Sequence, residues 1–171
     1  MRNLLYLLLF TVLAVSLNAC KNNDNSDAWK DANIDAYNAI TKNTDYHELQ
    51  TETGPTGVYY KKEQSGPGTE HPFQTSKVKV LYKGTYYDGT IFDAGTSQND
   101  APIELSLAQT VRGFSFALQQ MVVGDKWEIW IPYYLGYGSS GYYSPTTGAL
   151  LIKGYTTLVF EVELVDITLY P

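Results

Sequence analysis

The sequence predicts an α+β domain in which a curved antiparallel β-sheet wraps around one short α-helix, with a short N-terminal helix ahead of it. Apolar and polar residues alternate in segments that begin at Lys77, Trp127 and Leu158, which is the period of strands with one face in water. Between the first two segments the period changes to three and four residues, which indicates a helix with one apolar face. Because this single helix must bury its apolar stripe against the sheet, we expect the sheet to curve around it.

Residues 1–19 are predicted to be a lipoprotein signal peptide. Arg2 is followed by an apolar run from Leu4 to Leu17, which is shorter than the ~20 residues of a membrane span. The run ends in LNAC, and this resembles the lipobox of bacterial lipoproteins, in which the peptide is cut before an acylated cysteine. The alternative is a soluble secreted protein with an unrelated free Cys20. The position of this only cysteine favours lipidation, and therefore a bacterial cell-envelope protein anchored to a membrane, facing the periplasm or the surface.

Three further segments follow along the chain. Residues 20–27 are polar and are predicted to be a tether. Residues 28–56 are predicted to be an N-terminal helical segment, capped by Ser26 or Asp27, because apolar residues recur at spacings of three and four: Trp29, Ala32, Ala36, Ala39 and Ile40. Gly and Pro in TETGPTG break this pattern, so the domain itself is predicted over 57–171.

Within the domain, the elements are expected in a defined order. The first strand starts at Lys77, with apolar residues on one face and lysines on the other, and Asp88-Gly89 predicts a hairpin turn after it. A short strand is expected at 103–105. The helix has one apolar face and Gly124 to end it; that face comprises Phe114, Ala117, Leu118 and Met121. A strand from 127 to 131, a long loop over 133–154 and a final strand over 158–164 complete the prediction.

Several chemistries are excluded or disfavoured. A net charge of −6 lacks the basic face that nucleic-acid binding needs. The two histidines precede the periodic core and no residues have metal-ligand spacing, so neither a metal nor a cofactor is expected. A carboxylate pair for glycoside hydrolysis, Asp88 with Asp93 or Asp93 with Asp100, is disfavoured because Asp88 is explained by its turn and Asp100 by a polar loop.

The order of short motifs resembles that of FKBP-type peptidyl-prolyl cis-trans isomerases, in a bacterial lipoprotein form. The resemblance covers residues 57–168 and rests on six pieces in the right order: VLYKG (80–84), DGTIFD (88–93), VRGF (111–114), QMVVGD (120–125), IP with LGYG (131–138), and TLVFEVEL (157–164). It implies the fold described above and the activity of turning prolyl peptide bonds.

The resemblance also implies a pocket. Its catalytic residues would be Tyr82, Phe92, Asp93, Val111 (through its backbone N–H), Phe114, Tyr137 and Phe160. Its substrate-binding residues would be Ile103, Ile152 and Tyr142. The chain departs from the family at the rim: Phe114 stands where a tryptophan is usual, and the loop over 139–151 is longer.

Two interpretations of these residues stay open at this level. Asp93 would either accept a hydrogen bond from Tyr82 inside the pocket or satisfy backbone donors of its turn. The chain would either isomerise proline-containing polypeptides of exported clients, with macrolides as possible ligands, or be a catalytically weak module that presents its aromatic loop to a protein or glycan.

Overall fold

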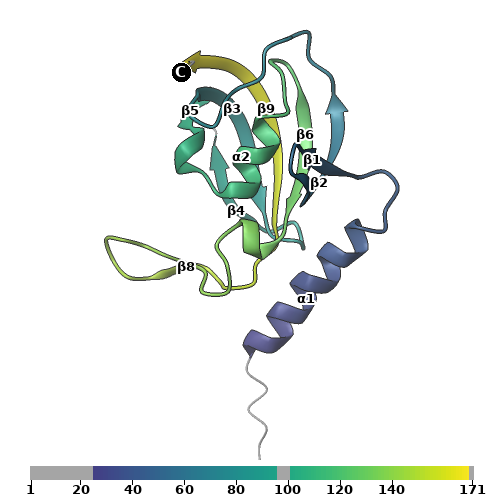
Figure 1. Ribbon diagram of the computed structural model, residues 1–171. Coiled ribbons are helices and arrows are strands. Elements are labelled where there is room, and N and C mark those ends of the chain that lie inside the picture. Colours follow the sequence, from purple (N-terminus) through teal and green to yellow (C-terminus); the bar gives the residue numbers. More distant parts are fainter. Residues whose placement is uncertain (1–24, 96–100, 170–171) are drawn as a thin grey trace, which may run out of the picture.

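The computed structural model describes residues 25–95 and 101–169, which form a seven-stranded antiparallel sheet curved around one short helix (Figure 1). The strand order is β1-β2-β6-β9-β3-β4, and β5 pairs with the first half of β3 while β4 pairs with its second half. The strands are β1 (His47–Thr51), β2 (Gly54–Gln64), β3 (Lys77–Thr85), β4 (Ile91–Gly95), β5 (Ile103–Ser106), β6 (Lys126–Ile131) and β9 (Leu158–Leu169). The predicted α+β class is confirmed.

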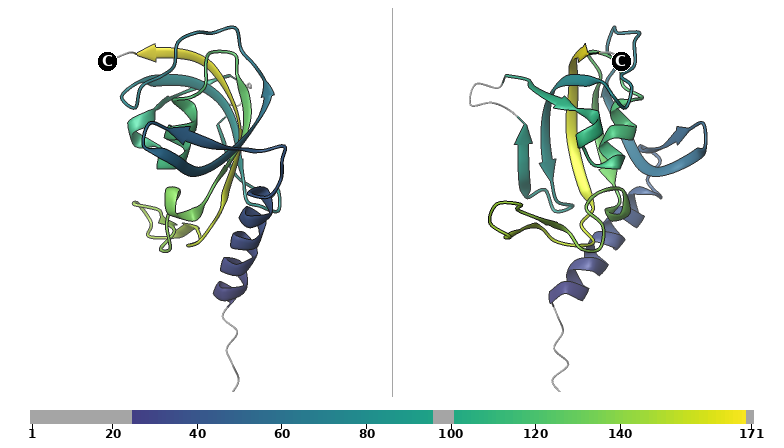
Figure 2. Two further views of the ribbon diagram at one scale, coloured as in Figure 1. Left: turned by 45° about the vertical axis from the view of Figure 1, so that its right-hand side comes forward. Right: turned by 60° about the vertical axis from the view of Figure 1, so that its left-hand side comes forward.

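The hydrophobic core lies between the concave face of the sheet and α2 (Arg112–Leu118) (Figure 2). α2 turns its apolar face inward, and the alternate residues of β3, β6 and β9 meet it; the fully buried members include Val80, Ala117, Leu118, Ile129 and Leu164. The helix was predicted to continue through Met121. It ends at Leu118 instead, and Met121 is buried in the turn beyond it. The apolar spacing therefore described one buried cluster rather than one helix.

The convex face of the sheet is charged. The lysines of β3 form ion pairs with neighbouring strands: Lys77–Glu104, Lys79–Asp166 and Lys83–Glu161. All of these side chains are close to half exposed, so each pair stabilises the fold by at most about 1 kcal/mol. Their main effect is to keep this face in water, as the alternation from Lys77 predicted.

Helix α1 (Asn25–Ile40) docks on the domain (Figure 1). Asn33 is fully buried: its Oδ1 accepts a hydrogen bond from the backbone N–H of Thr157 at 2.9 Å, and its carbonyl accepts one from the Thr157 hydroxyl at 3.1 Å. Trp29 Nε1 donates to Thr156 Oγ1 at 3.3 Å, and the Tyr37 hydroxyl donates to the carbonyl of Gly57 at 2.7 Å. A polar asparagine at the centre of the contact thus anchors α1 to the start of β9.

The segment boundaries differ from those predicted. The helical segment predicted over 28–56 is wrong beyond α1, because the helix ends at residue 40 and β1 lies inside that segment. The boundary expected at residue 57 falls within β2, and α1 begins at Asn25, inside the predicted tether. The predicted signal peptide and Cys20 lie outside the described residues. No helix in the described part of the chain is long and apolar enough to cross a membrane.

The long loop predicted over 133–154 carries structure of its own. It contains a 3₁₀ turn, η2 (Tyr133–Leu135), and a small hairpin of β7 (Tyr142–Tyr143) and β8 (Leu150–Ile152). This β7–β8 hairpin projects from the end of the domain near α1 (Figure 2). The segment is therefore a folded extension of the domain rather than an irregular connection.

Candidate ligand-binding site

An open cavity of about 320 Å³ lies between α2, β3 and the β7–β8 hairpin. It draws side chains from elements far apart in the sequence, because the curved sheet brings β3, β4 and β9 to the same side of α2. Of the described residues, these line it: Tyr82, Asp93, Leu105, Gln109, Thr110, Val111, Phe114, Tyr137, Tyr142 and Phe160.

Three aromatic rings form the inner wall. Phe114 from α2 and Phe160 from β9 meet edge-on with ring centroids 4.9 Å apart, and Tyr82 from β3 lies 6.1 Å from Phe114 and 5.9 Å from Phe160. Both phenylalanines are buried, with 3% and 7% of their surface exposed. Edge-to-face packing of this kind fixes ring orientation, so the wall offers a shaped apolar surface.

Two glycines make room for these rings. A Cβ at Gly95 would stand 1.9 Å from Cε1 of Tyr82, and a Cβ at Gly84 would stand 2.8 Å from Phe92 and 2.9 Å from Phe160. The rings therefore lie directly over backbone that carries no side chain. Gly95 pairs with Tyr82 across β3 and β4, so this strand pairing sets the ring's position.

Asp93 accepts a hydrogen bond from the Tyr82 hydroxyl, with 2.7 Å between the oxygens. Burial, together with this bond and the nearby carboxylate, raises the pKa of Tyr82 well above its usual range. The turn before β4 is served by Asp88 instead, whose Oδ1 accepts from the N–H of Thr90 at 2.9 Å, and this bond lowers the pKa of Asp88. Of the two interpretations of Asp93, the geometry matches the partnership with Tyr82.

Polar groups stand at the mouth of the cavity. Val111 precedes the first turn of α2, and no described residue accepts a hydrogen bond from its backbone N–H. On the other side, the ring of Tyr137 stacks on that of Tyr142 with centroids 5.0 Å apart. Burial raises the pKa of the Tyr137 phenol, so this hydroxyl stays protonated and can donate.

Seven of the ten predicted site residues line the cavity, and three do not. Phe92 on β4 is not part of the lining; its ring packs edge-on against that of Phe160 with centroids 5.7 Å apart. Ile103 packs half-buried against the core from β5, and Ile152 is buried in β8. Sequence reasoning missed Leu105, Gln109 and Thr110. Leu105 comes from β5, a strand that was predicted without a role in the site. Gln109 and Thr110 reach the site through the 3₁₀ turn η1 (Leu107–Gln109) and the residue after it, which carry no periodic signal.

This combination of fold and cavity defines a class: a half-open sheet, closed by one helix, that holds a small apolar group between aromatic rings with donors at the mouth. Comparison with known proteins identifies the family to which this class of fold and cavity belongs. The family described as FKBP-type peptidyl-prolyl cis-trans isomerase matches residues 68–165, more than half of the chain. The chain belongs to this family.

Individual relatives agree with the assignment. The FKBP-type 22 kDa peptidyl-prolyl cis-trans isomerase of Escherichia coli is 38% identical over 112 residues, covering 66% of this chain and 50% of the relative. Outer membrane protein MIP of Legionella longbeachae is 34% identical over 113 residues, covering 66% and 45%. A crystal structure of a peptidyl-prolyl cis-trans isomerase from Pseudomonas syringae superposes with a TM-score of 0.70 at 29% identity, covering 84% of this chain and 96% of that one. The chain thus spans about half the length of these two curated relatives.

Proposed function

We propose that this protein is a peptidyl-prolyl cis-trans isomerase that accelerates rotation about Xaa-Pro bonds in exported proteins. The observation that carries the proposal is the convergence of Tyr82, Phe114 and Phe160 from three separate elements on one cavity, with Asp93 bound to Tyr82 at its edge. The cavity volume of about 320 Å³ is enough for a pyrrolidine ring and its neighbouring peptide groups. The names of the relatives favour this function over a catalytically weak module that presents its aromatic loop to a protein or glycan.

The physical basis of catalysis is selective solvation. Rotation about a peptide bond has a barrier of ~18–20 kcal/mol because it breaks amide resonance, and Xaa-Pro bonds exchange over tens to hundreds of seconds. The planar amide is strongly dipolar and is well solvated by water, whereas the twisted amide is less dipolar. An aromatic cavity solvates the planar form poorly, so it binds the twisted form in preference, and this difference lowers the barrier.

The residues have distinct proposed roles. The proline ring enters between Tyr82, Phe114 and Phe160, and Phe92 packs against Phe160. The N–H of Val111 and the hydroxyl of Tyr137 hold carbonyl groups of the flanking peptide. The bond from Tyr82 to Asp93 fixes the tyrosine ring and places a carboxylate beside the twisting amide.

The location is proposed on separate grounds. Acylation at Cys20 would hold the protein on a membrane of the bacterial envelope, and the relative named outer membrane protein MIP supports an envelope setting. Cys20 precedes α1 by five residues, which reach at most about 18 Å when extended. The domain would then stay close to the bilayer. Loss of membrane fractionation in a Cys20→Ser variant is the expected result; retention would contradict lipidation.

Exchange spectroscopy tests the activity. The cis–trans exchange rate of a short Xaa-Pro peptide is measured by NMR with catalytic amounts of wild type, of Asp93→Ala and of Phe160→Ala, with Asp31→Ala on the exposed face of α1 as the control. We expect acceleration by wild type and by the control, and at least a tenfold loss in the other two. No acceleration by wild type contradicts the function. Acceleration that both site variants retain contradicts the site.

A macrolide ligand is proposed for the same cavity. Because a ligand that binds only the folded state raises its melting temperature, rapamycin is expected to raise that of the wild type and to have less effect on Phe160→Ala. An equal shift in both proteins would place the ligand elsewhere.

A further inference from the structure

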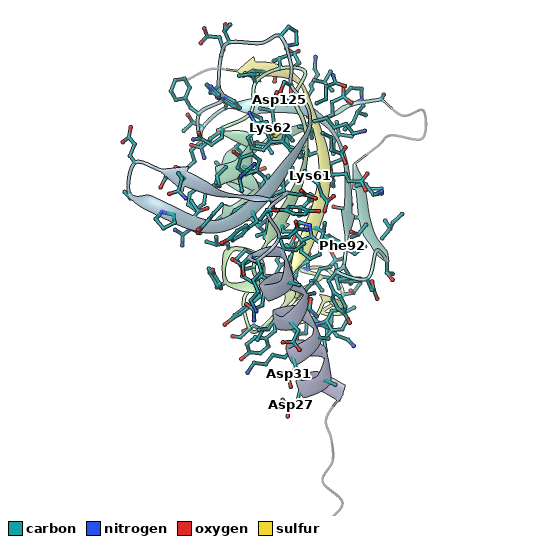
Figure 3. All side chains as sticks on the ribbon, turned by 90° about the vertical axis from the view of Figure 1, so that its right-hand side faces the viewer. Asp27, Asp31, Lys61, Lys62, Phe92 and Asp125 are labelled. Atoms are coloured by element: carbon teal, nitrogen blue, oxygen red, sulfur yellow. The ribbon has the colours of Figure 1, made fainter. Side chains whose placement is uncertain are left out.

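A second cavity, of about 440 Å³, lies between α1 and the β7–β8 hairpin. Its lining comes from the first turns of α1, from the base of the hairpin and from the segment before β9, and includes Trp29, Lys30, Tyr143, Leu150, Lys153 and Tyr155. Figure 3 shows Asp27 and Asp31 on the same first turns of α1. The α1 side of this cavity lies outside the segment that the family model matches, residues 68–165, and the other side lies within it.

The cavity has fixed walls. Asn33 and Trp29 tie α1 to the start of β9 through buried and half-buried hydrogen bonds. Tyr155, opposite Trp29, is the one non-glycine residue with a positive φ, 61°, in the described part of the chain. This conformation costs about 1–2 kcal/mol, and strain of this kind persists only where the surroundings enforce it. The fold therefore holds the backbone of Tyr155, and its ring packs against that of Tyr133 with centroids 5.0 Å apart.

Two lysine ammonium groups make part of the cavity lining positively charged. Lys30 Nζ lies 4.7 Å above the ring centroid of Tyr155, and Lys153 Nζ lies 5.0 Å above that of Trp29. Neither lysine forms an ion pair with any described residue, and of the three charged side chains in the lining only Asp27 is acidic. Each ammonium is held by a ring face on one side and keeps N–H donors for an anion on the other.

The rim beside these cations is apolar and exposed. Tyr143 has 53% of its surface exposed and Leu150 has 46%, and Lys153 is the only charged residue between 141 and 154. Exposed apolar residues gathered on one projecting hairpin are typical of a binding surface. The chemistry of the cavity therefore fits an apolar side chain next to a carboxylate.

The hairpin joins the two cavities. Tyr142 lines the first cavity and Tyr143 the second, because successive residues of a strand point to opposite faces. A strand layer with its side chains is ~10 Å thick, so a polypeptide that passes around the hairpin must span about 10–15 Å. At ~3.3 Å per extended residue, this takes about three to five residues. A polypeptide with its proline in the first cavity thus reaches the second cavity.

We propose that the cavity between α1 and the β7–β8 hairpin is a second client subsite, which takes an apolar–acidic residue pair three to five residues from the proline being isomerised. The proposal rests on the proposed isomerase function for the identity of its client. It assigns to α1 and the hairpin the selection among proline segments, while the aromatic cavity carries out the rotation.

Matched peptides test the subsite. One series carries Leu-Glu four residues before or after the proline, a second carries Leu-Gln at the same places, and a four-residue Xaa-Pro peptide reaches the first cavity only. We expect kcat/KM for one Leu-Glu peptide to exceed that of its Leu-Gln partner about fivefold at low salt, with the difference shrinking as salt screens it. Equal values for every Leu-Glu and Leu-Gln pair would overturn the proposal.

Charge variants assign the preference to this cavity. Lys30→Gln with Lys153→Gln is expected to abolish the Leu-Glu preference while the short peptide is isomerised at the wild-type rate. The double arginine variant, K30R with K153R, and the remote control Lys42→Gln, at an exposed site beyond α1, should both keep it. A preference that survives the double glutamine variant would overturn the proposal.

Two further measurements separate the remaining outcomes. If no peptide is isomerised, the proposed function fails. The subsite is then decided by calorimetric affinities: tighter binding of a Leu-Glu peptide than of its Leu-Gln partner supports it, and equal affinities overturn it. Sedimentation with phosphatidylglycerol vesicles that depends on Lys30 and Lys153, without any peptide preference, would assign this surface to the membrane and overturn the client subsite.

Discussion

The substitution Gly95→Ala tests how the fold positions the aromatic wall. The added Cβ would stand 1.9 Å from Cε1 of Tyr82, and ordinary contact begins at 3.4 Å, so the ring must move by about 1.5 Å. The Tyr82 hydroxyl would then leave the Asp93 carboxylate, which it now meets at 2.7 Å. Because Asp93 is exposed, loss of this hydrogen bond costs about 1 kcal/mol, the typical net value. Overpacking adds ~1–3 kcal/mol, and alanine in a strand recovers ~0.5–1 kcal/mol.

The expected net result for Gly95→Ala is a loss of about 1–3 kcal/mol in the free energy of unfolding and a fall of about tenfold in kcat/KM. Denaturant unfolding gives the first quantity, and exchange NMR on a short Xaa-Pro peptide gives the second, at a temperature where each protein is folded. Gly89→Ala is the matched control on the same hairpin: φ is +83° and no atom lies within 4 Å, so it strains the backbone by about 1–2 kcal/mol without touching the wall. Activity of Gly95→Ala equal to that of Gly89→Ala would refute the reasoning.

Three further predictions concern α1, the alkaline limit and the rim. Asn33→Ala leaves buried partners at the start of β9 unpaired and should cost about 2–3 kcal/mol in denaturant unfolding, whereas the exposed Asn38→Ala on the same helix should cost under 0.5 kcal/mol; similar losses would contradict the docking of α1. Burial and the bond to Glu128 raise the pKa of Tyr46 to about 12, so its contribution to stability is complete below pH 10 and is lost as the pH rises toward 12; because Tyr46 is partly exposed and solvent screens this interaction, unfolding at pH 9 and pH 11 should show a decrease that is smaller by only about 0.5 kcal/mol in Tyr46→Phe, and an identical decrease would contradict this assignment. Tyr142→Ala removes an aromatic with 39% of its surface exposed and should raise KM for short Xaa-Pro peptides a few-fold while leaving the melting temperature unchanged; an unchanged KM would exclude Tyr142 from the site.

The sequence predicted the elements whose one face is buried and whose other face meets water. β3, β6 and β9 alternate cleanly because the core lies on one side and charged pairs on the other. β1 and β2 were missed because each has one buried residue, Leu49 and Val58 respectively. Their pairing depends on backbone hydrogen bonds, which leave no apolar period in the sequence. Gly and Pro at 54–55 also indicated a break, although they open β2 at a tight turn.

The site residues that lie in family motifs were predicted, and Gln109 and Thr110, which lie outside these motifs, were missed. Only the family resemblance assigned Asp93 to the pocket. Its spacing alone left open that Asp93 binds backbone donors of its turn. Phe92 was placed in the wall, but only Phe160 lines the cavity; the two rings pack against each other over Gly84. The docking of α1 depends on a buried asparagine, Asn33, and a helical pattern of apolar residues does not reveal a polar anchor.

The most direct test of the central claim is a map of intermolecular nuclear Overhauser effects between the protons of a bound Xaa-Pro peptide and the aromatic side chains. The proline ring protons are expected to show effects to Phe114, Phe160 and Tyr82 together, since these three rings face one cavity. Effects confined to the exposed tyrosines of the β7–β8 hairpin, with none to Phe114 or Phe160, would contradict the account.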